Sequence, residues 1–175
     1  MRKVLDRLYQ ISGALAGTAI VLITLLIAAQ VAANLVTKMR IPGVNLSIPS
    51  YNDISGYLLA AASFLGLPYT LVKGGHIRVT LLVGRMGRRP RLVFELLTMA
   101  IGLVVAAGGA WYMWQLTGQS WLYGDMSSGI VPIPLWIVQI PPSVGLSILA
   151  VAFLDLIVQT AAAGQSPLVD AGSVE

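Results

Sequence analysis

The run "ISGALAGTAIVLITLLIAAQVAA", residues Ile11 to Ala33, decides the fold because none of its residues is charged. A helix needs about 20 mainly apolar residues to cross the roughly 30 Å hydrocarbon core of a bilayer. The whole chain has the same character, since 57% of its 175 residues are hydrophobic and only 10% are charged. We therefore expect an integral membrane protein rather than a soluble domain.

Three further stretches are long and apolar enough to span a membrane: residues 54–72, 92–117 and 135–162. We expect the second span to kink or stop at Pro68, and the fourth to bend, or to begin, at Pro141 and Pro142. The sequence thus predicts an all-α integral membrane protein with four transmembrane helices. Residues 1–163 would form one domain, and residues 164–175 a polar cytoplasmic tail.

The N-terminus has the charge pattern of a secretory signal, with Arg2, Lys3 and Arg7 before the first apolar run. Cleaved signals have apolar regions of about 7–15 residues, and this run is longer and is followed by three more spans. We interpret it as a retained signal anchor.

The basic residues predict the orientation of the chain. With four spans, both termini and the loop between the second and third spans share one side, which carries nine of the eleven basic residues; Lys38 and Arg40 lie on the other. The positive-inside rule then predicts a multi-pass protein of the bacterial inner membrane with cytoplasmic N- and C-termini. Residues 118–134 have no basic residue, and the aromatic residues nearby, Trp111, Trp114, Trp121 and Tyr123, fit the outer headgroup belt.

The cytoplasmic loop from Lys73 to Arg91 holds six basic residues and the only histidine. Arg78, Arg85 and Arg89 fall on one side of a helical wheel, which predicts a short interfacial amphipathic helix. Glycines and a proline in the same loop favour a short irregular turn instead, and both alternatives remain open. In either case the arginines would contact anionic lipid headgroups or acidic residues of a partner, with no nucleic acid involved.

The composition excludes several classes of membrane protein. The chain has no cysteine, so it cannot relay electrons through paired thiols, and one histidine cannot provide both axial ligands of a bis-histidine haem. No cluster has metal-ligand spacing, and no set of nucleophile, base and metal is visible. We therefore predict a protein without cofactor or catalytic activity.

Two carboxylates and the histidine are the candidate functional residues inside or beside the spans. Glu95 and Asp155 lie toward the cytoplasmic ends of their spans, and not at mid-bilayer, where a proton relay would be expected. Each is either an anchor paired with a nearby arginine or part of an ion pair that docks another subunit. His76 is either a structural cap or interface residue, or a pH sensor.

Small residues recur at four-residue intervals in two spans. Gly13 and Gly17 do so in the first, and Gly102, Ala106 and Ala110 in the third. This spacing lets membrane helices approach closely, so it predicts helix packing within the chain or with a partner.

The stretch "GGHIRVTLLVGRM", from Gly74 to Met86, resembles the small membrane subunit of tripartite ATP-independent periplasmic (TRAP) transporters, the DctQ-like family. His76, Ile77, Val79 and Thr80 match a stretch typical of that family. The run "IPLWIVQIPPSVGLSIL" (133–149) is similar to the proline-flanked start of its fourth span. Thr80 stands where an aspartate is frequent, so no role of that carboxylate carries over.

The resemblance implies a part in a three-component secondary transporter. A periplasmic substrate-binding protein would deliver a small, carboxylate-like organic anion to a large membrane subunit that transports it. The small subunit would be a non-catalytic scaffold for the large one. The alternative, from the residues alone, is a stand-alone tetraspan membrane scaffold or an assembly protein of another complex.

Overall fold

The computed structural model describes residues 2–39, 46–74 and 88–163. These residues form four helices, which are α1 (Arg2–Lys38), α2 (Tyr51–Val72), α4 (Arg88–Tyr123) and α5 (Leu135–Ala163). Each of the four is long and apolar enough to cross a membrane. The described part of the chain contains no strand, only an isolated bridge between Met126 and Pro134. The predicted four-span, all-α fold is confirmed.

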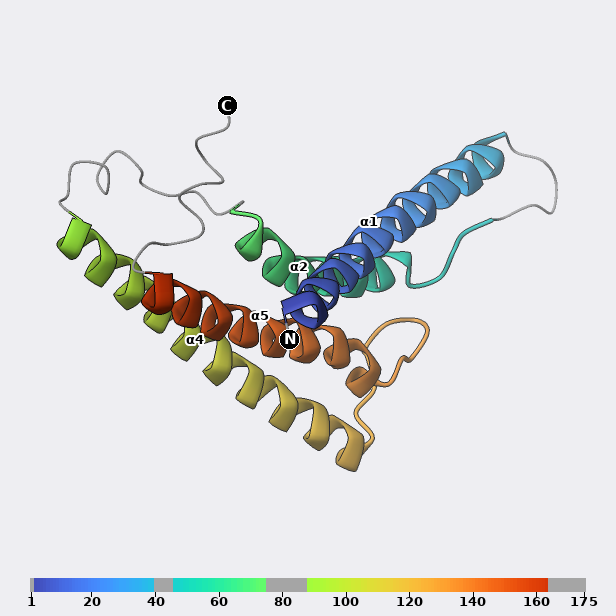
Figure 1. Ribbon diagram of the computed structural model, residues 1–175. Helices are drawn as coiled ribbons and strands as arrows, with labels where there is room; N and C mark the ends of the chain where they lie inside the picture. The colour runs from blue at the N-terminus through green and yellow to red at the C-terminus, as the bar shows by residue number, and fades with distance from the viewer. Residues whose placement is uncertain (1, 40–45, 75–87, 164–175) are drawn as a thin grey trace.

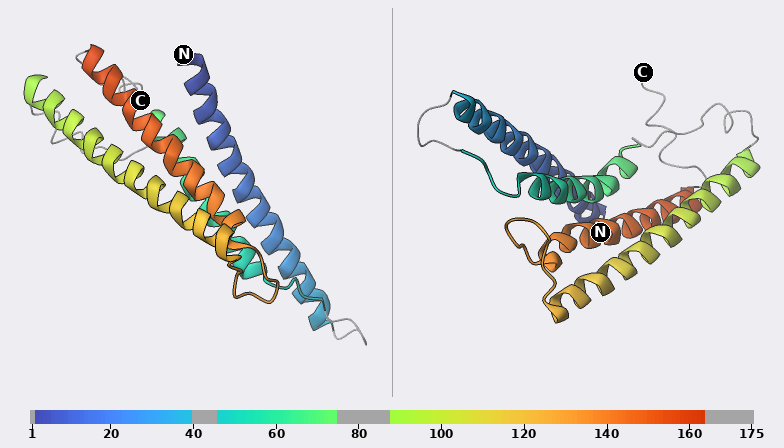
Figure 2. Two further views of the ribbon diagram at one scale, coloured as in Figure 1. Left: turned by 90° about the horizontal axis from the view of Figure 1, so that it is seen from below. Right: turned by 180° about the vertical axis from the view of Figure 1, so that it is seen from behind.

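The helices are arranged in a row rather than in a closed ring. α1 packs on α2, α2 packs on α5, and α5 packs on α4. Figure 1 and the right view of Figure 2 show α1 and α2 on one side of α5 and α4 on its other side. The apolar windows of the central helices α2 and α5 are accordingly more buried than those of α1 and α4.

The outer helices are longer than the predicted spans. α1 has 37 residues and α4 has 36. At 1.5 Å per residue each is about 55 Å long, well beyond the roughly 30 Å hydrocarbon core. Hydropathy identified only the apolar part, 11–33 and 92–117, because backbone hydrogen bonds continue the helix into polar flanks regardless of side-chain charge.

The prolines do not end or begin a helix. α2 continues past Pro68 to Val72, and α5 begins at Leu135, before Pro141 and Pro142. Neither a stop at Pro68 nor a start at Pro141 therefore occurs. Membrane helices tolerate proline because neighbouring helices and hydroxyl side chains can satisfy the backbone groups that it frees.

The predicted interfacial helix and the polar tail lie outside the described residues, which resume at Arg88 and end at residue 163.

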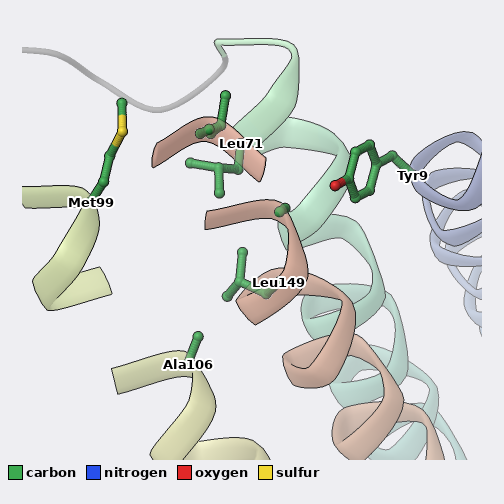
Figure 3. Close-up of a cluster of buried hydrophobic side chains, with 7 residues drawn as sticks. Tyr9, Leu71, Met99, Ala106 and Leu149 are labelled. Carbon is green, nitrogen blue, oxygen red and sulfur yellow. The ribbon is translucent and has the colours of Figure 1, made fainter. Parts of the chain in front are cut away.

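The main core cluster draws on all four helices. Figure 3 shows Tyr9 of α1, Leu71 of α2, Met99 and Ala106 of α4 and Leu149 of α5 converging. Ala152 and Leu156 of α5 complete the cluster, and both are at most 2% exposed. α5 thus contributes more buried residues to this core than any other helix, in keeping with its central place in the row.

Candidate functional site

The structure places only some of the predicted functional residues. His76, Arg78 and Arg85 lie outside the described residues. Arg89 belongs to the first turn of α4, but only its backbone is described. Glu95 lies partly buried on α4, and Asp155 lies partly buried on α5. Their proposed contacts with lipid or a partner remain predictions.

Asp155 takes part in a contact between the first and last helices. The Tyr9 hydroxyl of α1 donates a hydrogen bond to Asp155 Oδ2 at 3.4 Å, and Tyr9 is only 2% exposed. One turn further along α5, Gln159 Oε1 accepts a hydrogen bond from Arg2 at 3.2 Å. The start of α1 and the end of α5 therefore lie at the same end of the molecule, which we call the terminal end.

The opposite end, called the loop end, is held by hydrogen bonds to connecting segments. Gln30 Oε1 of α1 accepts a hydrogen bond from the Ile48 backbone N–H at 2.8 Å. Ser50 Oγ, just before α2, accepts one from the Val131 N–H at 2.9 Å. The connection between α4 and α5 is thus fixed to the start of α2, although the two are far apart in sequence.

A second set of contacts surrounds the proline of α2. Because proline has no N–H, Pro68 leaves the carbonyl group of Phe64 without its usual helical donor. α5 packs on this turn so closely that a side-chain carbon at Gly145 would lie 2.5 Å from the Phe64 carbonyl oxygen. From the other neighbour, α1, the Ser12 hydroxyl donates a hydrogen bond to the Leu65 carbonyl oxygen at 2.6 Å.

Ser12, Leu65, Pro68 and Gly145 form what we call the Pro68 clasp. Ser12 is only 1% exposed. If α1 and α2 separated within the apolar interior, its hydroxyl would be left there without a hydrogen-bond partner, which costs free energy. The clasp ties α1 and α5 to one turn of α2. Its chemistry is structural, because it presents no reactive or ionisable group, and its effect is to fix three helices relative to one another.

α4 is attached to α5 by small residues and by polar contacts. A side-chain carbon at Gly102 would lie 2.5 Å from the ring of Phe153, so this glycine allows the close approach. Towards the loop end, Trp114 Nε1 donates a hydrogen bond to Ser147 Oγ at 3.0 Å. The hydroxyls of Thr117 and Ser143 lie 3.1 Å apart in a buried contact. Such interhelical hydrogen bonds hold membrane helices together.

The prediction that the small residues pack against other helices is confirmed for the whole motif of α4, but for only one of the two glycines of α1. Gly13 packs against Tyr69 of α2, while Gly17 has no neighbouring atom within 4 Å of an added side-chain carbon. The packed face of α1 carries Ser12, Ala16 and Ala19 instead. In α4, Gly102, Ala106 and Ala110 all face inward, as Ala106 and Ala110 are 2% and 8% exposed.

Sequence reasoning missed Tyr9, Ser12 and Gly145. Tyr9 carries no local signal that it would meet Asp155, which is 146 residues away. Ser12 stands directly beside Gly13, so the small-residue motif marked the right turn of the helix. Gly145 follows two prolines, and no pattern within α5 showed that it would face another proline-containing helix.

The charged residues of the described helices lie toward their ends, with Glu95 and Asp155 the furthest inside. Within residues 2–39, 46–74 and 88–163, no group of three or more His, Cys, Asp or Glu residues could hold a metal ion.

Comparison with known families gives one match. Residues 23–163 match the family described as "Tripartite ATP-independent periplasmic transporters, DctQ component". The matched range contains the second part of α1, from Ile23 onward, and all of α2, α4 and α5. No curated protein and no solved structure matches the chain significantly. Since the match covers most of a chain with the expected four spanning helices, the protein belongs to the DctQ component family of tripartite ATP-independent periplasmic transporters.

Proposed function

We propose that this chain is a non-catalytic scaffold that stabilises and orients the large membrane subunit of a TRAP-type importer of small organic anions. Family membership supports a place in such a transporter rather than the alternative of a stand-alone tetraspan protein. The large subunit would bind and move the substrate, after a periplasmic binding protein has delivered it.

The observation that carries the scaffold role is the Pro68 clasp. A proline within a spanning helix is a frequent site of bending, yet here Ser12 and Gly145 hold the proline turn from two sides. Hydrogen bonds also connect the row at the terminal end, between Tyr9 and Asp155, and at the loop end, between Val131 and Ser50. A subunit that transports by moving against a neighbour needs that neighbour to keep its shape.

The orientation that we propose places the terminal end in the cytoplasm, at the bacterial inner membrane. Arg2, Lys3, Arg7 and Lys73 lie at this end, while Lys38 lies at the other. The arginines of the loop before α4 would then contact anionic headgroups or acidic residues of the large subunit.

Co-purification with the large subunit tests the scaffold role. A tagged copy of the chain, extracted in mild detergent from cells that produce both membrane subunits, should recover the larger protein in a stable complex. Uptake of the organic anion should require both subunits, together with the binding protein. Recovery of the chain alone as a stable, monodisperse protein from such cells would contradict the proposal.

The basic residues in and after the loop between α2 and α4 need their own test. The triple variant R78E/R85E/R89E should lower subunit recovery or uptake, because each basic side chain near an anionic surface contributes about 1 kcal/mol. The matched lysine variant R78K/R85K/R89K keeps the charge and should retain both. Unchanged recovery and uptake in the glutamate variant would show that these arginines have no anchoring role.

A further inference from the structure

All four tryptophans of the chain gather toward the loop end. Trp111, Trp114 and Trp121 belong to the last part of α4, and Trp136 stands in the first turn of α5. Four aromatic residues in this part of α4 are strongly exposed: Trp111 at 66%, Tyr112 at 72%, Trp121 at 65% and Tyr123 at 74%. This part of α4 therefore presents a large aromatic surface that no other described element of the chain covers.

The connection that follows α4 also exposes apolar side chains. Met126 and Ile130 are exposed, at 56% and 84%. The ring of Trp121 meets that of Trp136 edge-on, with centroids 4.6 Å apart, so the surface is attached to the start of α5. We call residues 111–123 of α4, with Met126 and Ile130, the aromatic end.

Charge is almost absent from the aromatic end. No lysine or arginine follows Arg91 in the whole sequence, and Asp125 is the one charged residue between Glu95 and Asp155. An acidic partner would find no cation here. Large apolar surfaces that are left in water promote aggregation.

The depth of these rings follows from the length of α4. A hydrocarbon core of about 20 residues that begins directly after Glu95 ends close to Gln115. Trp111 and Trp114 then lie just inside the acyl region, and Trp121 and Tyr123 lie outside it, about 9–12 Å beyond Gln115 along the helix axis. The aromatic end straddles the boundary at which tryptophan and tyrosine are enriched in membrane proteins, because their rings are apolar and their N–H or O–H groups are polar.

We propose that the aromatic end docks in the headgroup layer of the bilayer, so that lipid, and no other subunit, covers this side of α4. The apolar face below it supports lipid as the occupant, because Ile101, Val104 and Val105 are at least 58% exposed and continue the surface into the core region. The inference does not depend on the proposed scaffold role, since it concerns what covers one helix of this chain.

Depth-dependent fluorescence quenching tests the proposal on the full chain in lipid nanodiscs. One variant retains Trp111 and carries W114F, W121F and W136F, and a second retains Trp121 and carries W111F, W114F and W136F. Trp111 should lose more emission to lipids with bromine on the acyl chains than to lipids with a nitroxide headgroup. Trp121 should show the reverse order. A third variant, with only Trp136 retained, is the shielded control, because this ring is partly buried and should be quenched less by either lipid.

The measurement is repeated on the complex with the large membrane subunit. Persistence of lipid quenching at Trp111 and Trp121 supports lipid as the occupant. Loss of that quenching in the complex would overturn the proposal in favour of a covering subunit, without affecting co-purification itself. Strong quenching by aqueous acrylamide with none by either lipid would overturn it in favour of water.

If the single-tryptophan variants lose their helical circular dichroism signal, the same quenchers are applied to the wild-type chain. Most of its emission should be quenched by the labelled lipids and little by acrylamide, and the opposite order would overturn the proposal.

Discussion

At the residue scale, the Ser12 hydroxyl is the contact between α1 and α2 whose loss can be measured most directly. We expect Ser12→Ala to lower the free energy of unfolding by roughly 0.5–2 kcal/mol, because the Leu65 carbonyl loses a buried donor. Thr18→Ala is the matched control, since Thr18 is exposed and bonds only to the Ala14 carbonyl of its own helix. Denaturation in detergent micelles measures both, and equal effects would show that the Ser12 bond adds nothing to the packing of α1 on α2.

Gly145 and Gly17 provide a pair of glycines with opposite expected outcomes. Gly145→Ala should destabilise the protein by about 1–3 kcal/mol, because the new methyl group would overlap the Phe64 carbonyl unless α2 and α5 move apart. Gly17→Ala should be neutral or stabilising by up to about 1 kcal/mol, because it removes a helix-weakening glycine and meets no atom. Thermal unfolding in detergent compares them. A stable Gly145→Ala variant would show that the α2–α5 approach is looser than the structure indicates.

At the element scale, the first turns of α1 depend on the end of α5. Tyr9 and Arg2 make this connection, while Val4, Leu8 and Ile11 are exposed on the same part of the helix. We expect Tyr9→Phe to keep the ring packed and to weaken only this attachment, by about 1 kcal/mol, so that amide exchange in the first turns of α1 rises about fivefold. Hydrogen-exchange mass spectrometry of the purified chain measures it, and α2 serves as the internal control. Exchange that rises equally in both helices would indicate global destabilisation instead.

The elements themselves could be predicted because hydropathy alone determines where a chain crosses a membrane. The order in which they pack could not. Lipid-facing and helix-facing side chains are both apolar, so the periodicity that identifies the inner face of a soluble helix is weak here. Gly13 and Gly17 illustrate this, since both belong to the same spacing motif and only Gly13 meets α2. The Pro68 clasp was equally hidden, because it depends on which residues of α1 and α5 reach one turn of α2.

The candidate functional residues were predictable to a smaller degree. Asp155 was recognised because a carboxylate within an apolar span is uncommon, but its contact with Tyr9 joins opposite ends of the sequence. His76, Arg78 and Arg85 were recognised from charge and family resemblance, and the described residues do not include them.

At the scale of the whole molecule, the helix row has consequences that no single helix shows. Each outer helix has one packed side, so α1 and α4 expose much of their surface, whereas α2 and α5 are fixed between neighbours. The large subunit and the lipid must share the exposed surfaces. If the aromatic end of α4 faces lipid, the side of α1 away from α2 becomes the larger remaining area for contact with a subunit.

The orientation of this row in the membrane can be established with cysteine labelling, because the natural chain has no cysteine and each introduced thiol is unique. Lys3→Cys places a thiol at the exposed terminal end, and Ser128→Cys places one at the exposed loop end. Since most basic residues cluster with the terminal end, we expect a membrane-impermeant maleimide added to spheroplasts to label Ser128→Cys and not Lys3→Cys. Both should be labelled after the membrane is disrupted, which controls for reactivity. Labelling of Lys3→Cys alone in intact spheroplasts would invert the orientation and place the arginine-rich loop outside, where it could no longer meet the anionic cytoplasmic leaflet.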